Sequence, residues 1–148
     1  MSSLRYRVMT EPDITGVVRL YVEYYNTRED GCWTPEKAYR RIHQVWSTED
    51  AFCLLQEEDG ALSGFAMGYL SQYDDLVAYD LVEIVIAAGR QGRGLGTALL
   101  GELERRVREA GAAMMQLQSV NDEMHAHFYG KMGFVRTTNL LPLNKFFE

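Results

Sequence analysis

Long apolar runs and an excess of positive charge are both missing from this sequence. No apolar stretch approaches the roughly 18 residues that a membrane span needs, and the opening residues MSSLRYRVMTEP do not contain the apolar core of a signal peptide. The 21 acidic side chains outnumber the 15 basic ones, and the net charge of −6 would repel a phosphate backbone. We therefore expect a cytoplasmic protein that binds neither membranes nor nucleic acid.

Cysteine and histidine are too few and too scattered to predict a metal centre. The two cysteines, Cys32 and Cys53, form no CxxC pair, and His43, His125 and His127 complete no zinc-ligand spacing with them. Repeats and Pro/Ser-rich linkers are missing too, and 148 residues suit one domain of ordinary size. We expect no metal ion, two reduced thiols and a single domain, residues 1–148.

Strand-like and helix-like patterns alternate along the chain, which predicts a mixed α/β protein. Asp59 and Gly60 suit the tight turn of a hairpin, Thr34 suits a helix N-cap before Pro35, and Gly111 is placed to end a helix. The predicted helices are residues 10–26, 35–46, 94–110 and 122–134. The predicted strands are residues 4–9, 51–58, 61–73, 81–88 and 113–120, with 134–147 as a closing strand or hairpin, while 27–34 and 74–80 are polar connections.

The segment RQGRGLGT, Arg90 to Thr97, joins the strand 81–88 to the helix 94–110. Its glycines permit positive φ angles and leave amide hydrogens unshielded at a helix N-terminus, where anions bind readily. Arg90 and Arg93 add charge-assisted donors. The turn therefore predicts a diphosphate site. Its glycine spacing fits neither a Rossmann fingerprint nor a P-loop, because the sixth place counted from Gly92 is Thr97 and no Gly-Lys-Ser/Thr follows.

Two motifs resemble those of the GNAT superfamily of acetyl-CoA-dependent N-acetyltransferases. QGRGLG, residues 91–96, resembles its Q/R-x-x-G-x-G/A signature, and NDEMHAHFYGKMGF, residues 121–134, resembles its second signature. The order of the predicted elements agrees over nearly the whole chain. The resemblance implies a central mixed, mostly antiparallel β-sheet of six or seven strands, flanked by about four helices, in one N-acetyltransferase domain.

The same resemblance implies which residues would bind acetyl-CoA. Asn121 would contact the pantetheine arm, with Asp122 as the alternative, because Asn121 precedes Tyr129 by eight residues where seven is commoner in the family. The backbone of a cofactor strand would pair with that arm as an added strand does. The strand residues are Ile84, Val85 and Ile86, and the pyrophosphate would be held by Gln91, Gly92, Arg93, Gly94, Leu95, Gly96 and Thr97.

Acetyl transfer to an amine needs a neutral nucleophile and an acid for the departing thiolate. An alkylamine with a pKa of about 10.4 is neutral in about one molecule in 2,500 at pH 7, a handicap of about 4.6 kcal/mol, so a nearby carboxylate helps. Glu83 stands on the cofactor strand, where the family often has an acidic residue acting through water; Asp80 is the second candidate. A paired strand residue is the alternative interpretation of Glu83. Tyr129 holds the family's tyrosine position and would protonate the thiolate.

An aromatic and acidic set lies in the part of the chain that shapes the acceptor pocket in the family. Aromatic faces beside carboxylates suit an ammonium group, so we expect a small cationic amine as acceptor. The set consists of Tyr21, Tyr24, Tyr25, Glu29, Asp30 and Trp33. Asp74, Asp75 and Asp80 of the later polar connection could add the same attraction or form a plain turn. We assign Tyr25, Glu29, Trp33 and Asp80 to the substrate site. Packing is the alternative for Tyr21 and Tyr25, which share a helical stripe with core residues.

Other functions fit the same motifs. One alternative is acetylation of a peptide N-terminus or a protein lysine, and another is a non-catalytic acyl-CoA-binding module. The apolar ending LLPLNKFF would suit a homodimer formed through C-terminal strands, as is common in the family.

Overall fold

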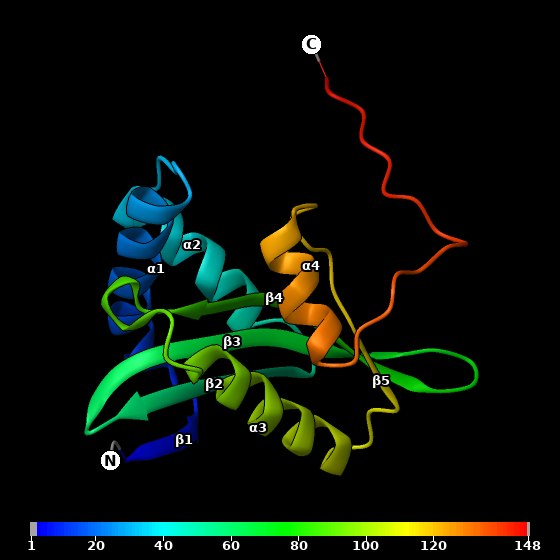
Figure 1. Cartoon of the computed structure of the whole chain (residues 1–148), viewed down its shortest axis with the longest axis horizontal. Helices are drawn as coiled ribbons and strands as arrows, with labels where there is room; N and C mark the ends of the chain where they lie inside the picture. Colours follow the sequence, from blue (N-terminus) through cyan, green and yellow to red (C-terminus); the bar gives the residue numbers. More distant parts are fainter. Residues whose placement is uncertain (1–2, 148) are drawn as a thin grey trace. The chain divides into compact units, whose positions relative to one another are not determined.

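The computed structural model describes residues 3–147, which form two compact units (Figure 1). The first unit ends at Leu117 and the second begins at Gln118. The first contains a β-sheet and three α-helices, whereas the second contains α4 (Glu123–Lys131). None of the helices in the described part of the chain is long and apolar enough to cross a membrane.

The sheet of the first unit has five strands in the order β1-β2-β3-β4-β5. Neighbouring strands are antiparallel, apart from the parallel pair β4 and β5. The strands are β1 (Leu4–Val8), β2 (Ala51–Glu58), β3 (Ala61–Gln72), β4 (Val77–Ile86) and β5 (Met114–Gln116). The predicted fold class, a mixed and mostly antiparallel sheet with four helices, is confirmed, with five strands in place of six or seven.

The helices begin and end close to the positions that capping residues predict. The first unit contains α1 (Ile14–Arg28), α2 (Pro35–Trp46) and α3 (Leu95–Glu109), with short 3-10 turns at Glu11–Asp13 and Ala88–Arg90. The Thr34 side chain accepts a hydrogen bond from the Lys37 amide at 3.2 Å, as an N-cap does. Gly111 has a φ of 105°, the left-handed conformation that suits a residue just past a helix end.

Three predicted strand boundaries were wrong. β4 begins at Val77 inside the expected polar connection, because Ala78 and Tyr79 are buried and pair with β3. β5 is shorter than the predicted strand 113–120. The predicted closing strand or hairpin is not formed, since residues 134–147 contain neither helix nor strand. That segment includes Asn139 and Pro142, which are poor strand formers. The homodimer predicted from its apolar residues stays a prediction.

Apolar side chains cover both faces of the sheet. On one face, α1 and α2 pack Tyr21 and Ile42 against Phe65 and Met67 of β3, and all four side chains are fully buried. The other face carries α3, which buries three leucines at helical spacing, Leu99, Leu100 and Leu103. Burying each of these side chains contributes about 1.5–3 kcal/mol of hydrophobic stabilisation.

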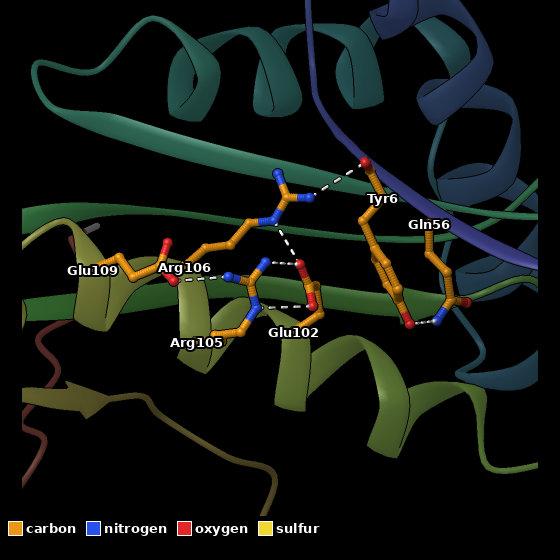
Figure 2. Close-up of polar contacts among 6 residues, drawn as sticks. All are labelled: Tyr6, Gln56, Glu102, Arg105, Arg106 and Glu109. Carbon is orange, nitrogen blue, oxygen red and sulfur yellow. Dashed lines mark hydrogen bonds and ion pairs between the residues drawn. The ribbon is translucent and has the colours of Figure 1, made fainter.

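Polar contacts also attach α3 to the edge strand β1 (Figure 2). Glu102 accepts hydrogen bonds from Arg105 and from Arg106, and Arg106 in turn donates to the backbone carbonyl of Tyr6 at 3.3 Å. The Tyr6 hydroxyl accepts a hydrogen bond from Gln56 of β2 at 3.2 Å. These contacts fix the C-terminal half of α3, the helix that follows the glycine-rich turn, to the edge of the sheet.

A β-bulge in β4 determines which of its side chains face α1 and α2. Glu83 pairs with Met67, whereas Leu81 pairs with Gly68, the next residue of β3, so β4 has one extra residue between them. Residues three apart on a strand ordinarily point to opposite faces. Because of the extra residue, Asp80 and Glu83 lie on the same face.

We expect Gly68→Ala to destabilise the fold. A Cβ at position 68 would lie 2.0 Å from the Asp80 carbonyl oxygen and 2.7 Å from the Tyr79 ring, so β3 and β4 would have to separate. Overpacking of this kind lowers the free energy of unfolding by about 1–3 kcal/mol, which urea denaturation measures. Gly101→Ala in α3 is the control, because a Cβ there meets nothing within 4 Å. A Gly68→Ala variant as stable as the wild type would contradict the packing described here.

Candidate active site

The turn between β4 and α3 presents backbone amides to open space. Gly92 and Gly94 have φ angles of 75° and 79°, a conformation that favours glycine. Gly94 is the N-cap of α3, and no side-chain hydrogen bond caps that end of the helix. A Cβ at either glycine would meet nothing within 4 Å. The first amides of α3, those of Leu95, Gly96 and Thr97, have no acceptor within the helix, which is the condition that makes a helix N-terminus attract anions.

The cofactor strand has an open edge next to this turn. Ile84, Val85 and Ile86 pair with β3 on one side. On the other side, β5 pairs only with Ala78 through Asp80, and no further strand within residues 3–147 continues that edge. The backbone at 84–86 therefore has the strand geometry that an added extended chain would pair with.

The polar side chains of the turn bind the protein itself. Arg90 and Arg93 both form ion pairs with the same oxygen, Oε1 of Glu58 on β2, Arg90 at 2.5 Å. The Gln91 side chain donates a hydrogen bond to the Ile86 carbonyl at 2.7 Å. The turn is thus held in shape by its own side chains, and an anion would meet its amides and the outer edges of the two guanidinium groups.

Glu83 lies in a buried polar cluster beneath α1 and α2. Its side chain is 8% exposed, and its two oxygens accept hydrogen bonds from the hydroxyls of Tyr21 at 3.0 Å and Tyr25 at 2.8 Å. The Arg41 guanidinium adds an ion pair at 3.3 Å. Burial, followed by the charge of Glu83, raises the pKa of both tyrosines, so they stay protonated donors. Tyr21 and Tyr25, for which packing is the alternative interpretation, thus both contact the predicted base directly.

The other three predicted acceptor residues lie in three different places. Trp33 packs edge-on against Tyr21, with ring centroids 5.0 Å apart, so it belongs to the Glu83 cluster. Glu29 follows α1 and accepts a hydrogen bond from Tyr24 at 2.9 Å. Asp80 faces the same side as Glu83 but belongs to another network, which is considered next.

Asp80 is held by the strands on either side of it. One carboxylate oxygen accepts a hydrogen bond from Ser71 of β3, and the other accepts one from Gln116 of β5 at 2.7 Å. Gln116 also donates to the Tyr73 hydroxyl at 3.0 Å. With both oxygens engaged by neighbouring strands, Asp80 is placed to join β4 to β3 and β5.

The second unit contains Asn121, Asp122 and Tyr129. Asp122 caps α4, since its carboxylate accepts a hydrogen bond from the His125 amide at 2.8 Å, which lowers the pKa of Asp122. Asn121 precedes the cap and is exposed. Because capping engages the Asp122 side chain, Asn121 is the better candidate for a ligand contact. Tyr129 lies on α4, with its ring 5.5 Å from that of Phe134.

Comparison with known proteins identifies the family. The family model of the acetyltransferase (GNAT) family matches residues 14–134, and the chain belongs to that family. It is an acetyl-CoA-dependent N-acetyltransferase. No sequence among the curated proteins matches it.

Solved structures share the fold at low sequence identity. The ribosomal-protein-alanine N-acetyltransferase of Brucella melitensis is 16% identical, with a TM-score of 0.76 over 97% of this chain and 100% of that one. The glucosamine-6-phosphate N-acetyltransferase of Arabidopsis thaliana is 19% identical, with a TM-score of 0.71 over 99% of both chains. The aminoglycoside N-acetyltransferase AAC(6')-Iy in complex with CoA is 14% identical, with a TM-score of 0.75 over 98% of this chain and 96% of that one.

The sequence did not reveal the polar residues that support the glycine-rich turn. Gln56, Glu58 and Ser63 are all buried on the β2–β3 hairpin. A signal was present in AFCLLQEE, because Gln56 and Glu58 are two residues apart and so point to the same face of an otherwise apolar strand. No pattern within the strand indicates that Glu58 pairs with two arginines more than thirty residues away in the sequence.

The two cysteines differ in their access to solvent. Cys53 belongs to the core cluster, and burial raises the pKa of its thiol to about 11, so only about 0.1% is thiolate at pH 8. Cys32 is exposed in the connection between α1 and α2. Of the two thiols, that of Cys32 is therefore the one accessible to reagents in solution.

We expect a thiol reagent such as DTNB to modify Cys32 of the native protein rapidly at pH 8, and Cys53 only on unfolding. Cys32→Ser should remove the fast reaction, and Cys53→Ser should preserve it, because Cys53 is 3% exposed and Cys32 is exposed. Two equally fast thiols in the native protein would contradict the burial of Cys53.

Proposed function

We propose that the protein transfers the acetyl group of acetyl-CoA directly to the primary amine of a small cationic molecule. The observation that carries the proposal is the buried carboxylate of Glu83 on β4, the strand whose open edge leads to the glycine-rich turn. Two tyrosine hydroxyls of α1 donate hydrogen bonds to this carboxylate. The family model spans both units, which supports the proposal that they form one N-acetyltransferase domain.

Glu83 is the proposed base. A carboxylate on this face would attract an ammonium group and accept its proton through a water molecule. The neutral nitrogen then attacks the thioester carbon, and the carbon–sulfur bond breaks while the sulfur takes a proton from the Tyr129 hydroxyl. The nitrogen loses its second proton to solvent as the amide forms, and the Tyr129 phenolate regains a proton from solvent. A phenol can serve there because its pKa lies only about 1.5 units above that of a thiol.

The surroundings of Glu83 support a cationic acceptor. Tyr21 and Tyr25 contact the carboxylate, and Trp33 packs on the Tyr21 ring. Aromatic rings beside a negative charge favour an ammonium group. The net charge of −6 acts in the same direction at longer range. The structural neighbours include acetyltransferases named for aminoglycosides, for glucosamine-6-phosphate and for a ribosomal-protein alanine. A peptide acceptor is therefore the alternative that the experiment must address.

The first experiment is a thermal melt with and without acetyl-CoA. Ligand at about 100 times its dissociation constant stabilises the folded state by about 2.7 kcal/mol and raises Tm by several degrees. A rise should be followed by a screen for thiol release with small cationic amines, free lysine peptides and peptide N-termini. We expect release with the small amines. Acetylation of peptides alone would overturn the acceptor assignment, and no rise with any acyl-CoA would overturn the donor assignment.

We expect Glu83→Gln to lower kcat/KM by about 100-fold or more at pH 7, the scale of a lost general base, and by less as the pH approaches the pKa of the amine. The deficit shrinks because an amine that is already neutral needs no base. Glu104→Gln on the exposed side of α3 is the matched control and should leave the rate unchanged. An equal deficit at every pH would assign Glu83 a purely structural role, and unchanged activity would contradict the proposal.

A further inference from the structure

Three buried polar side chains support the glycine-rich turn from below. Gln56 and Ser63 are fully buried and Glu58 is 2% exposed, in a part of the sheet where the other buried residues are apolar. Gln56 donates a hydrogen bond to the carbonyl of Leu95, the first residue of α3, and accepts one from Ser63 at 2.7 Å. The Ser63 carbonyl accepts from the Ala87 amide at the start of the turn. Both ends of the turn are thus fixed to the β2–β3 hairpin.

Glu58 fixes the middle of the turn by charge. Its side chain is 3% exposed, and its Oε1 atom forms ion pairs with the guanidinium groups of both Arg90 and Arg93. The two arginine side chains are 31% and 51% exposed. The carboxylate is therefore hidden under the turn, while each guanidinium has one edge on the carboxylate and another toward solvent.

Glu58 counteracts the repulsion between the neighbouring guanidinium groups of Arg90 and Arg93, because both pair with its Oε1 atom. Arg90 and Arg93 must lie close together to contact the same atom, and like charges at that separation repel each other unless an opposite charge lies between them. The three groups together carry a net charge of +1. A guanidinium has five N–H donors, so contact with Glu58 leaves others available for a ligand.

We propose that Glu58 is a positioning residue of the donor site. It holds Arg90 and Arg93 side by side, so that their remaining donors and the amides near Gly92 and Gly94 are ordered before a diphosphate arrives. This inference rests on the proposed function, since the diphosphate is that of the acetyl-CoA donor. A buried carboxylate thus strengthens the binding of an anion, through the two cations that it orders.

If Glu58 had a competing role instead, neutralising it would change the donor affinity in the opposite direction. If Glu58 merely competed with the diphosphate for the arginines, its neutralisation would free them and tighten donor binding. In the proposed role, neutralisation lets the guanidinium groups repel each other and swing apart, and the ligand must then order them itself. The direction of the change in donor affinity therefore distinguishes the two roles.

The test compares acetyl-CoA with acetyl-pantetheine, which has the same thioester and arm but no pyrophosphate. For Glu58→Gln we expect the KM for acetyl-CoA to rise at least about tenfold, with kcat at saturation within about twofold of wild type. The rate with acetyl-pantetheine should be unchanged. Glu57→Gln is the matched control, because Glu57 is the adjacent residue of β2 and pairs with Arg7 instead of the turn.

The outcomes separate the inference from the function on which it rests. Wild-type protein that does not bind acetyl-CoA would overturn the proposed function. Wild-type protein that binds it, together with a Glu58→Gln variant that binds it equally well or more tightly, would overturn the inference alone. Equal losses with both donors would show general damage and would also overturn it. Should Glu58→Gln not fold, Glu58→Asp keeps the charge but shortens the reach, and the same selective loss for acetyl-CoA is expected.

Discussion

A carboxylate that is removed from water needs hydrogen-bond donors or cations around it. The first unit contains two buried carboxylates, and their partners differ. Glu83 is surrounded by two tyrosine hydroxyls and one guanidinium, whereas Glu58 contacts two guanidiniums. Each carboxylate draws together side chains from separate elements. α1 and α2 meet β4 at Glu83, and the turn before α3 meets β2 at Glu58. The two candidate sites are arranged around these two charges.

The geometry of β4 connects the two sites. Its extra residue turns Glu83 toward α1 and α2, and the strand then continues without a strand partner on its outer edge until it reaches the turn. Gly68 permits the close approach of β3 and β4 beside the bulge, because the Asp80 carbonyl occupies the space that any Cβ would need. A single residue without a side chain thus permits the local irregularity that places a catalytic candidate and a binding edge on one strand.

Local signals in the sequence predicted most of the fold. The Asp59–Gly60 turn, the Thr34 cap and the glycines around α3 each require one backbone conformation, and the structure has it at all of these positions. The start of β4 was missed because Val77 follows a run of polar residues, and its strand character comes from pairing with β3. Residues 134–147 were assigned a strand on apolar content, although a strand also needs a partner.

The candidate sites were only partly predictable, for the same reason. Tyr25, Trp33 and Glu83 could be nominated from residue type and family motif, and the structure brings these three together. The orientation of Arg93 depends on Glu58, which is 35 residues away in the sequence. Nothing local to either residue specifies that pairing. Long-range partners of this kind are decided by the topology of the sheet, which side-chain patterns along one strand do not encode.

Alternation along the β2–β3 hairpin divides its residues between the two faces of the sheet. Leu55, Phe65 and Met67 lie with α1, α2 and the Glu83 cluster, whereas Gln56 and Glu58 reach the turn before α3. If the Glu83 face binds the acceptor, as proposed, substitutions there can change which molecule is acetylated while the residues that support the turn stay the same. The alternating hairpin would then let acceptor specificity diverge independently of donor binding.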